Sequence, residues 1–89
     1  MRWDIVDKAF ELGAEYIGMS KRKDKRFYVV YNGKKINFGD PNAHTYFDGA
    51  SPQKRRNYRA RHSKIKLKDG SLAYKNKNQA SYWAWNLLW

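Results

Sequence analysis

Residues 26–38 read RFYVVYNGKKINF, two runs of β-branched and aromatic residues separated by the dipeptide Asn32-Gly33. Asn-Gly supplies the two positive φ angles of a type I′ turn, so this stretch predicts a β-hairpin with a two-residue loop. A loop of that length also sets which residues lie opposite one another. The pairs expected on the core face are Val29 with Ile36 and Phe27 with Phe38, and the other face carries Tyr28, Val30, Lys35 and Asn37.

The first twenty residues predict an amphipathic helix. Acidic side chains recur at helical spacing, and apolar side chains fill most of the remaining circumference. Gly18 is positioned to end this helix as a C-terminal cap residue. A secretory signal begins with cations and continues with an apolar block, so the segment does not fit one. The acidic stripe consists of Asp4, Asp7, Glu11 and Glu15.

Downstream of the hairpin, turn-forming residues predict a loop over residues 39–50. Ser51 followed by Pro52 is the N-cap and first-turn pattern of a helix, which we expect to end near Ser63 or Lys64. Residues 80–89 are apolar on all sides and predict a short terminal helix.

Asp69-Gly70 predicts a second hairpin. In the register that its two-residue loop would set, Leu67 lies opposite Leu72 and Ile65 lies opposite Tyr74.

These elements predict an α+β fold, with an N-terminal amphipathic helix, a small antiparallel sheet, a basic helix and an apolar C-terminal helix over the sheet. Eighty-nine residues are too few for two cores, so we expect one domain over residues 1–89. Within it, residues 1–20 form the acidic-faced helix and residues 21–89 the basic body.

The chain has no cysteine, which excludes disulfides and thiolate zinc sites. No apolar run reaches the roughly 18 residues that span a bilayer.

Charge is distributed unevenly along the chain. Nineteen Lys and Arg against eight Asp and Glu give a net charge of +11. Residues 1–20 carry two cations and four acids, a net charge of −2, and residues 21–89 carry 17 cations and four acids, a net charge of +13. Self-repulsion of that size destabilises an isolated compact state, so we expect an anionic partner.

The densest cationic stretch, Lys54 to Lys68, is the strongest candidate for a binding site, because phosphate recognition requires several cations on one surface. A solvated helix face is the simpler alternative. Charge alone does not distinguish nucleic acid from an acidic protein surface. The predicted anion contacts are Lys54, Arg55, Arg56, Arg59 and Lys64 on the helix, and Lys21, Arg22, Lys23, Lys34 and Lys35 in a second patch.

Aromatic residues are abundant, and in a small chain without disulfides they are expected mainly in the core or in a subunit contact. Stacking of nucleic-acid bases on Tyr28, Tyr31 or Tyr46 is the less favoured alternative. The side chains expected to anchor the fold or a neighbouring subunit are Tyr58, His62, Trp83, Trp85, Leu88 and Trp89.

Catalytic and metal sites have weak support. His44 and Asp48 have i, i+4 spacing and His62 would complete a metal or acid–base site, but structural roles explain both histidines more simply. Ser51 and Ser63 lack the surroundings of a nucleophile. We therefore expect no catalytic residues, no bound metal and no cofactor.

Several residues, taken in order, resemble a small basic domain of uncharacterised function found in large DNA viruses and tailed phages. The resemblance covers roughly residues 25–89, and its most specific parts are Tyr58-x-x-Arg61-His62 and Leu87-Leu88-Trp89. It also includes Phe38-Gly39. It implies a viral origin and a virion component.

The expected function is therefore that of a non-enzymatic structural protein of the virion, a minor capsid or capsid-lining protein whose basic face contacts capsid neighbours or the genome. The alternative is a nucleic-acid-binding protein without sequence preference, and a small nuclease is less favoured still. An anionic membrane fits poorly as a partner because the amphipathic helix has an acidic face. We expect no small-molecule substrate.

Overall fold

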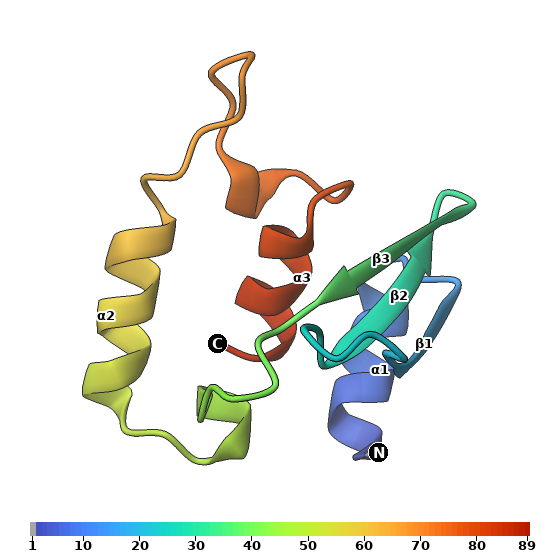
Figure 1. Ribbon diagram of the computed structural model, residues 1–89, viewed down its shortest axis with the longest axis horizontal. Coiled ribbons are helices and arrows are strands. Elements are labelled where there is room, and N and C mark those ends of the chain that lie inside the picture. Colours follow the sequence, from blue (N-terminus) through green and yellow to red (C-terminus); the bar gives the residue numbers. More distant parts are fainter. Residues whose placement is uncertain (1) are drawn as a thin grey trace.

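The computed structural model describes residues 2–89 (Figure 1). Met1, which the predicted 1–20 segment includes, lies outside the described residues. The prediction of an α+β fold with an antiparallel sheet is confirmed. The elements are α1 (Trp3–Glu11), β1 (Tyr16–Met19), β2 (Phe27–Tyr31), β3 (Lys34–Phe38), α2 (Pro52–His62) and α3 (Ala80–Leu87), with 3₁₀ turns at Tyr46–Asp48 and Ala73–Lys75.

The Asn-Gly hairpin forms in the predicted register. Val29 lies opposite Ile36 and Phe27 opposite Phe38. Asn32 has φ 52° and Gly33 has φ 73°, the two positive angles that the dipeptide was expected to supply. Because the register holds, alternate residues of both strands reach the core.

The N-terminal helix is shorter than predicted. It ends at Glu11 and not near Gly18, and Gly13 leaves the helix with φ 101°. Residues Tyr16–Met19, which were expected to extend the helix, form the edge strand β1 and pair antiparallel with β2. The helical periodicity was misleading here, because the same apolar side chains can also be buried from a strand. Pairing with the hairpin provides such a strand position for residues Tyr16–Met19.

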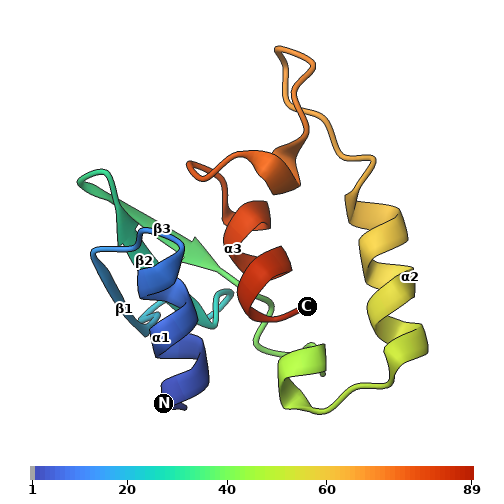
Figure 2. The same ribbon diagram turned by 180° about the vertical axis from the view of Figure 1, so that it is seen from behind.

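One face of the sheet forms the core. Helices α1 and α3 lie on this face, α1 against β1 and α3 against β3 (Figures 1 and 2). Ile17, Val29 and Ile36 contribute one buried residue from each strand. The predicted helix over residues 80–89 is confirmed in essence, since α3 spans Ala80–Leu87 and its Trp83 is completely buried.

Helix α2 lies on the outer side of α3, which separates it from the sheet in both views (Figures 1 and 2). Its start is as predicted: the Ser51 hydroxyl accepts a hydrogen bond from the Lys54 amide at 3.2 Å, and Pro52 occupies the first turn. The helix ends at His62, close to the expected end. None of the helices in residues 2–89 has the length and apolar character needed to cross a membrane.

The second predicted hairpin is wrong in detail. Around Asp69-Gly70 the chain turns back, but only one isolated bridge forms, between Lys66 and Leu72. Leu67 bonds to Ser71 across the turn, at 2.8 Å. The observed pairing is therefore displaced by one residue from the expected one, and the Ala73–Lys75 3₁₀ turn replaces a second strand.

Candidate anion-binding surface

The outward side of α2 carries cations that have no carboxylate partner. Arg56 bonds only to the neighbouring Gln53, at 2.8 Å between Nη2 and Oε1. The three ion pairs among residues 2–89 involve Arg2, Arg22 and Arg26, and none of them lies on α2. This outer basic face consists of the exposed side chains of Lys54, Arg56 and Arg61 on α2 and of Lys64 just beyond its end.

Two of the predicted anion contacts point inward instead. Arg55 donates from Nε to the main-chain oxygen of Trp89 at 2.7 Å, and Arg59 donates from Nη2 to the same oxygen at 3.1 Å. Arg55 also lies over the Tyr46 ring, and Arg59 over the Trp85 ring. At 100° per residue, positions 55 and 59 fall on the same side of α2 as Tyr58 and His62, so both arginines face the interior of the protein.

These two arginines line a cavity of about 310 Å³ between α1, the 3₁₀ turn at Tyr46–Asp48, α2 and the end of the chain. Arg2 and Lys8 also line the cavity, against one acid, Asp4. Burial and then the nearby charge of Arg55 lower the pKa of Arg59. We call this the arginine cavity; its excess of cations makes it suitable for a carboxylate or phosphate oxygen.

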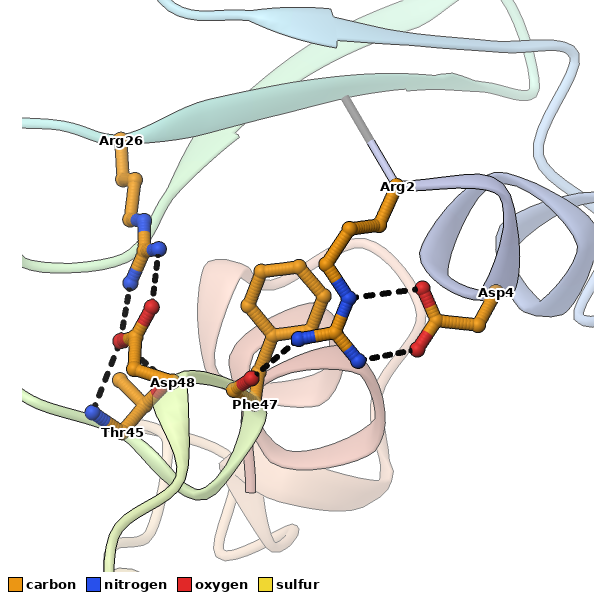
Figure 3. A network of polar contacts seen from close by, with 6 residues as sticks. All are labelled: Arg2, Asp4, Arg26, Thr45, Phe47 and Asp48. Atoms are coloured by element: carbon orange, nitrogen blue, oxygen red, sulfur yellow. Dashed lines mark hydrogen bonds and ion pairs between the residues drawn. The ribbon is translucent and has the colours of Figure 1, made fainter.

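Arg2, which lines the arginine cavity, is held by several polar contacts (Figure 3). It binds the Asp4 carboxylate through Nε and Nη2, at 3.1 and 2.5 Å, and donates from Nη1 to the Phe47 main-chain oxygen at 2.6 Å. Its guanidinium also lies 4.1 Å from the centroid of the Phe47 ring. Arg2 thus ties α1 to the 3₁₀ turn, a role that the sequence did not reveal.

A second polar network, also missed by sequence reasoning, fastens the loop after β3 to the start of β2 (Figure 3). Both carboxylate oxygens of Asp48 pair with the Arg26 guanidinium, which holds the pKa of Asp48 well below its usual range, assisted by the Thr45 amide and hydroxyl. Both Thr45 donors lie 2.9 Å from Asp48 Oδ2. The signal was present, because Thr45-x-x-Asp48 has the spacing of a capping box.

The second predicted patch is divided between two ends of the sheet. Lys21, Arg22 and Lys23 lie in the turn between β1 and β2, and Arg22 is paired with Asp24. Lys34 and Lys35 follow the hairpin turn at the other end of β2. A five-residue strand is roughly 15 Å long, so the two groups do not share one contact site.

The predicted anchor residues are buried in the protein's own core or are partly buried beside it. Tyr58 is stacked between His62 and Trp89, with ring centroids 3.9 and 4.4 Å away. Burial raises the pKa of Tyr58 to about 12, and burial with the nearby Arg61 charge lowers that of His62. Trp85 stacks on Tyr74 at 4.2 Å, and both Trp83 and Leu88 are almost fully buried. These rings attach α2 to α3.

The less favoured candidates find little support in the structure. Tyr31 packs on the core residue Trp83 at 5.8 Å between ring centroids, so it does not form a base-stacking surface. Tyr28 remains on the uncovered face of the sheet, with the Lys35 ammonium 4.3 Å from its ring. Asp48 is bound by Arg26, and residues 2–89 contain no group of three His, Cys, Asp or Glu side chains that is arranged to hold a metal ion.

The chain is similar to a family and to a viral protein whose functions are uncharacterised. The family of unknown function DUF5754 matches residues 17–62, just over half of the chain, from β1 to the end of α2. The uncharacterized protein L851 of Acanthamoeba polyphaga mimivirus is 37% identical over 91 aligned positions, which cover 97% of this chain and 91% of that protein. No solved structure matches the chain at a significant level.

These matches cover a different part of the chain from the resemblance seen in the sequence. The family match includes Phe38-Gly39 and Tyr58-x-x-Arg61-His62 but ends before Leu87-Leu88-Trp89, so the full motif pattern stays a prediction. The similarity to the mimivirus protein extends over nearly the whole chain, so it also takes in most or all of the N-terminal helix, which the expected resemblance left out. This chain, a small viral domain, belongs to DUF5754, a family of unknown function.

Proposed function

We propose that this protein is a non-enzymatic structural component of a virus particle, a minor capsid or capsid-lining protein whose outer basic face contacts an anionic neighbour. One observation carries the proposal. Of the 19 Lys and Arg side chains, three are paired, which leaves 16 without a carboxylate within 4.0 Å among residues 2–89. The similarity to a mimivirus protein supports the viral setting.

The arrangement of α2 supports a contact along one side of the helix. Its inner side is occupied by the aromatic stack and by the bonds from Arg55 and Arg59 to Trp89. The outer basic face is therefore held in a fixed orientation toward solvent. An isolated ion pair in water contributes little binding free energy. A partner that binds all four cations at once must therefore present several anionic groups on one surface.

A second candidate function, nucleic-acid binding without sequence preference, uses the same face. Arg56 and Arg61 favour it, because a guanidinium can present two parallel N–H donors to one phosphate. The two candidates differ in the source of the anion: carboxylates of capsid proteins in the first, phosphates of the genome in the second.

Location in the particle tests the first proposal. Quantitative mass spectrometry of purified virions, before and after genome release, should find the protein retained with the emptied shells. Absence of the protein from mature virions would contradict the structural role, and loss of the protein together with the released genome would favour the second candidate.

Binding to random-sequence duplex DNA separates the candidates in vitro. A genome binder should lose affinity steeply with salt, and the triple variant Arg56→Gln/Arg61→Gln/Lys64→Gln should flatten the log–log salt slope by about three units. The matched control Lys21→Gln/Lys23→Gln/Lys34→Gln removes the same charge from the ends of the sheet and should change the slope less. A protein that binds no DNA at low salt but binds genome-free shells would exclude the second candidate.

A further inference from the structure

Large exposed apolar side chains are concentrated on two neighbouring elements, α1 and β1. Among residues 2–89, six large hydrophobic residues are exposed, and four of them belong to α1 and β1. A group of this kind on a small domain marks a contact surface. The four are Trp3, Phe10, Tyr16 and Met19, with exposed fractions of 77%, 48%, 54% and 69%.

The position of α1 on the sheet shows where its two exposed rings lie. Helix α3 covers the β3 side of the sheet and α1 covers the β1 side. Asp4 and Lys8 of α1 line the arginine cavity next to α3. At 100° per residue, Trp3 and Phe10 fall on the opposite flank of α1, so they lie along the free edge of the sheet beside β1.

Strand β1 itself has an unpaired side. It is hydrogen-bonded to β2 alone, since the strand order is β1-β2-β3. The Ser20 amide donates to the Arg26 oxygen at 3.1 Å. In an antiparallel pair only every second residue is hydrogen-bonded to the partner strand, so Gly18 is directed toward β2 as Ser20 is. Ile17 and Met19 therefore direct their N–H and C=O groups away from β2. No hydrogen bond in the described part of the chain satisfies these groups, and such an edge is a template for another strand.

We propose that two copies of this chain associate through their β1 strands, antiparallel about a two-fold axis at Gly18. In this register Ile17 of one copy lies opposite Met19 of the other, which pairs the outward-directed backbone groups of both strands. The two three-stranded sheets then form one six-stranded sheet. The inference goes beyond the proposed function and uses none of the residues of the outer basic face.

Charge complementarity supports the second copy as the occupant of this edge. In the proposed register the cationic turn after β1 of one copy, which carries Lys21 and Lys23, lies beside the start of β1 of the other copy, where the Glu15 carboxylate accepts a hydrogen bond from the Gly33 amide at 3.0 Å. The two-fold axis repeats this arrangement. The apolar flanks of the two α1 helices come together on the same face of the sheet, so Trp3 of one helix approaches Phe10 of the other. Asp7 and Glu11 point away from the sheet and stay in water.

Sedimentation equilibrium of the full chain, after removal of bound nucleic acid at high salt, tests the association. We expect a reversible monomer–dimer equilibrium, and the variant Trp3→Glu/Phe10→Glu should weaken it at least about tenfold while circular dichroism remains unchanged. The control Ile65→Glu alters an exposed apolar residue outside α1 and β1 and should leave the equilibrium unchanged. A protein that stays monomeric at its solubility limit, or a dimer that is indifferent to the double variant, would overturn the proposal.

Cysteine cross-linking tests the register, because the natural chain has no cysteine. In Tyr16→Cys/Ser20→Cys the two cysteines of one chain are about 13 Å apart along the strand, too far for a disulfide, whereas the register places each opposite the other in the second copy. Mild oxidation should yield covalent dimers, and Ile65→Cys should not. Absence of dimers from the double variant would rule out the β1 pairing even if the protein self-associates by another face.

Discussion

At the scale of single residues, Asp48 joins two parts of the molecule that are far apart in sequence. Its carboxylate binds Arg26 at the start of β2 and both donors of Thr45, and all three lie in a partly buried setting (Figure 3). A paired carboxylate with several donors stabilises the fold only while it is charged.

We therefore expect Asp48→Asn to lower the free energy of unfolding by about 2 kcal/mol at neutral pH, because it leaves the Arg26 guanidinium without its partner. The pKa of Asp48 is depressed in the folded state, so its contribution is complete above the ordinary value of 3.8 and is lost as the pH falls further. Urea unfolding at pH 7 and pH 3 should show a smaller difference between wild type and variant at pH 3. Asp7→Asn, an exposed site, is the control; a constant difference at both pH values would contradict the assignment.

The pKa of Tyr58 is shifted upward, in the opposite direction to that of Asp48. Burial, slightly opposed by the Arg61 charge, raises its pKa from 10.0 to about 12. The folded-state pKa is raised, so stability is complete below pH 10 and is lost as the pH rises toward 12. In a titration followed by tyrosinate absorbance, Tyr58→Phe should remove the last step. Removal of an early step by Tyr58→Phe would show that the ring is accessible to water.

At the scale of elements, α2 has a weak tendency to form a helix alone, because few apolar residues lie along it. The N-cap at Ser51 and the aromatic contacts of Tyr58 compensate for this. The helix is therefore sensitive to its first turn.

Ser51→Ala should lower the free energy of unfolding by about 1 kcal/mol, because the Lys54 amide loses its side-chain acceptor. Ser63→Ala at the other end of α2 removes a hydroxyl that only donates to the Ala60 oxygen, and it should have a much smaller effect. Chemical denaturation of the two variants makes the comparison. Equal effects would indicate that the cap contributes nothing specific.

The elements also show what local sequence reveals. The Asn32-Gly33 turn and the Ser51-Pro52 start were predictable, because backbone geometry at those positions depends on the residues themselves. The end of α1 was not, because Tyr16–Met19 suit either a helix or a strand and the choice depends on β2. The one-residue shift at Asp69-Gly70 has the same origin, since no neighbouring strand fixes that pairing.

At the scale of the whole molecule, a net charge of +11 on 89 residues opposes folding. Three of the eight acidic residues lie on α1, and α2 lies on the far side of α3 from the sheet (Figure 1). The fold forms only three ion pairs among residues 2–89, so most of the positive charge is not neutralised within the molecule. Solvent ions or a partner must reduce the repulsion.

The melting temperature should therefore rise when NaCl is increased from about 50 to about 500 mM, because screening reduces the repulsion between cations. Sulfate should raise it further. The triple variant Arg56→Gln/Arg61→Gln/Lys64→Gln should melt higher than wild type at low salt and respond less to added salt. A melting temperature that is independent of salt, measured by calorimetry, would show that the isolated fold tolerates its charge.

The sequence by itself determined the fold class, the hairpin register, the start of α2 and the excess of positive charge, because these depend on residues close together in the chain and on composition. Tertiary structure alone decided that β1 is a strand, that Arg26 and Asp48 form a pair, and that Arg55 and Arg59 turn inward to Trp89. Each of these depends on a partner at least 8 residues away in the chain, and only folding brings such partners into contact.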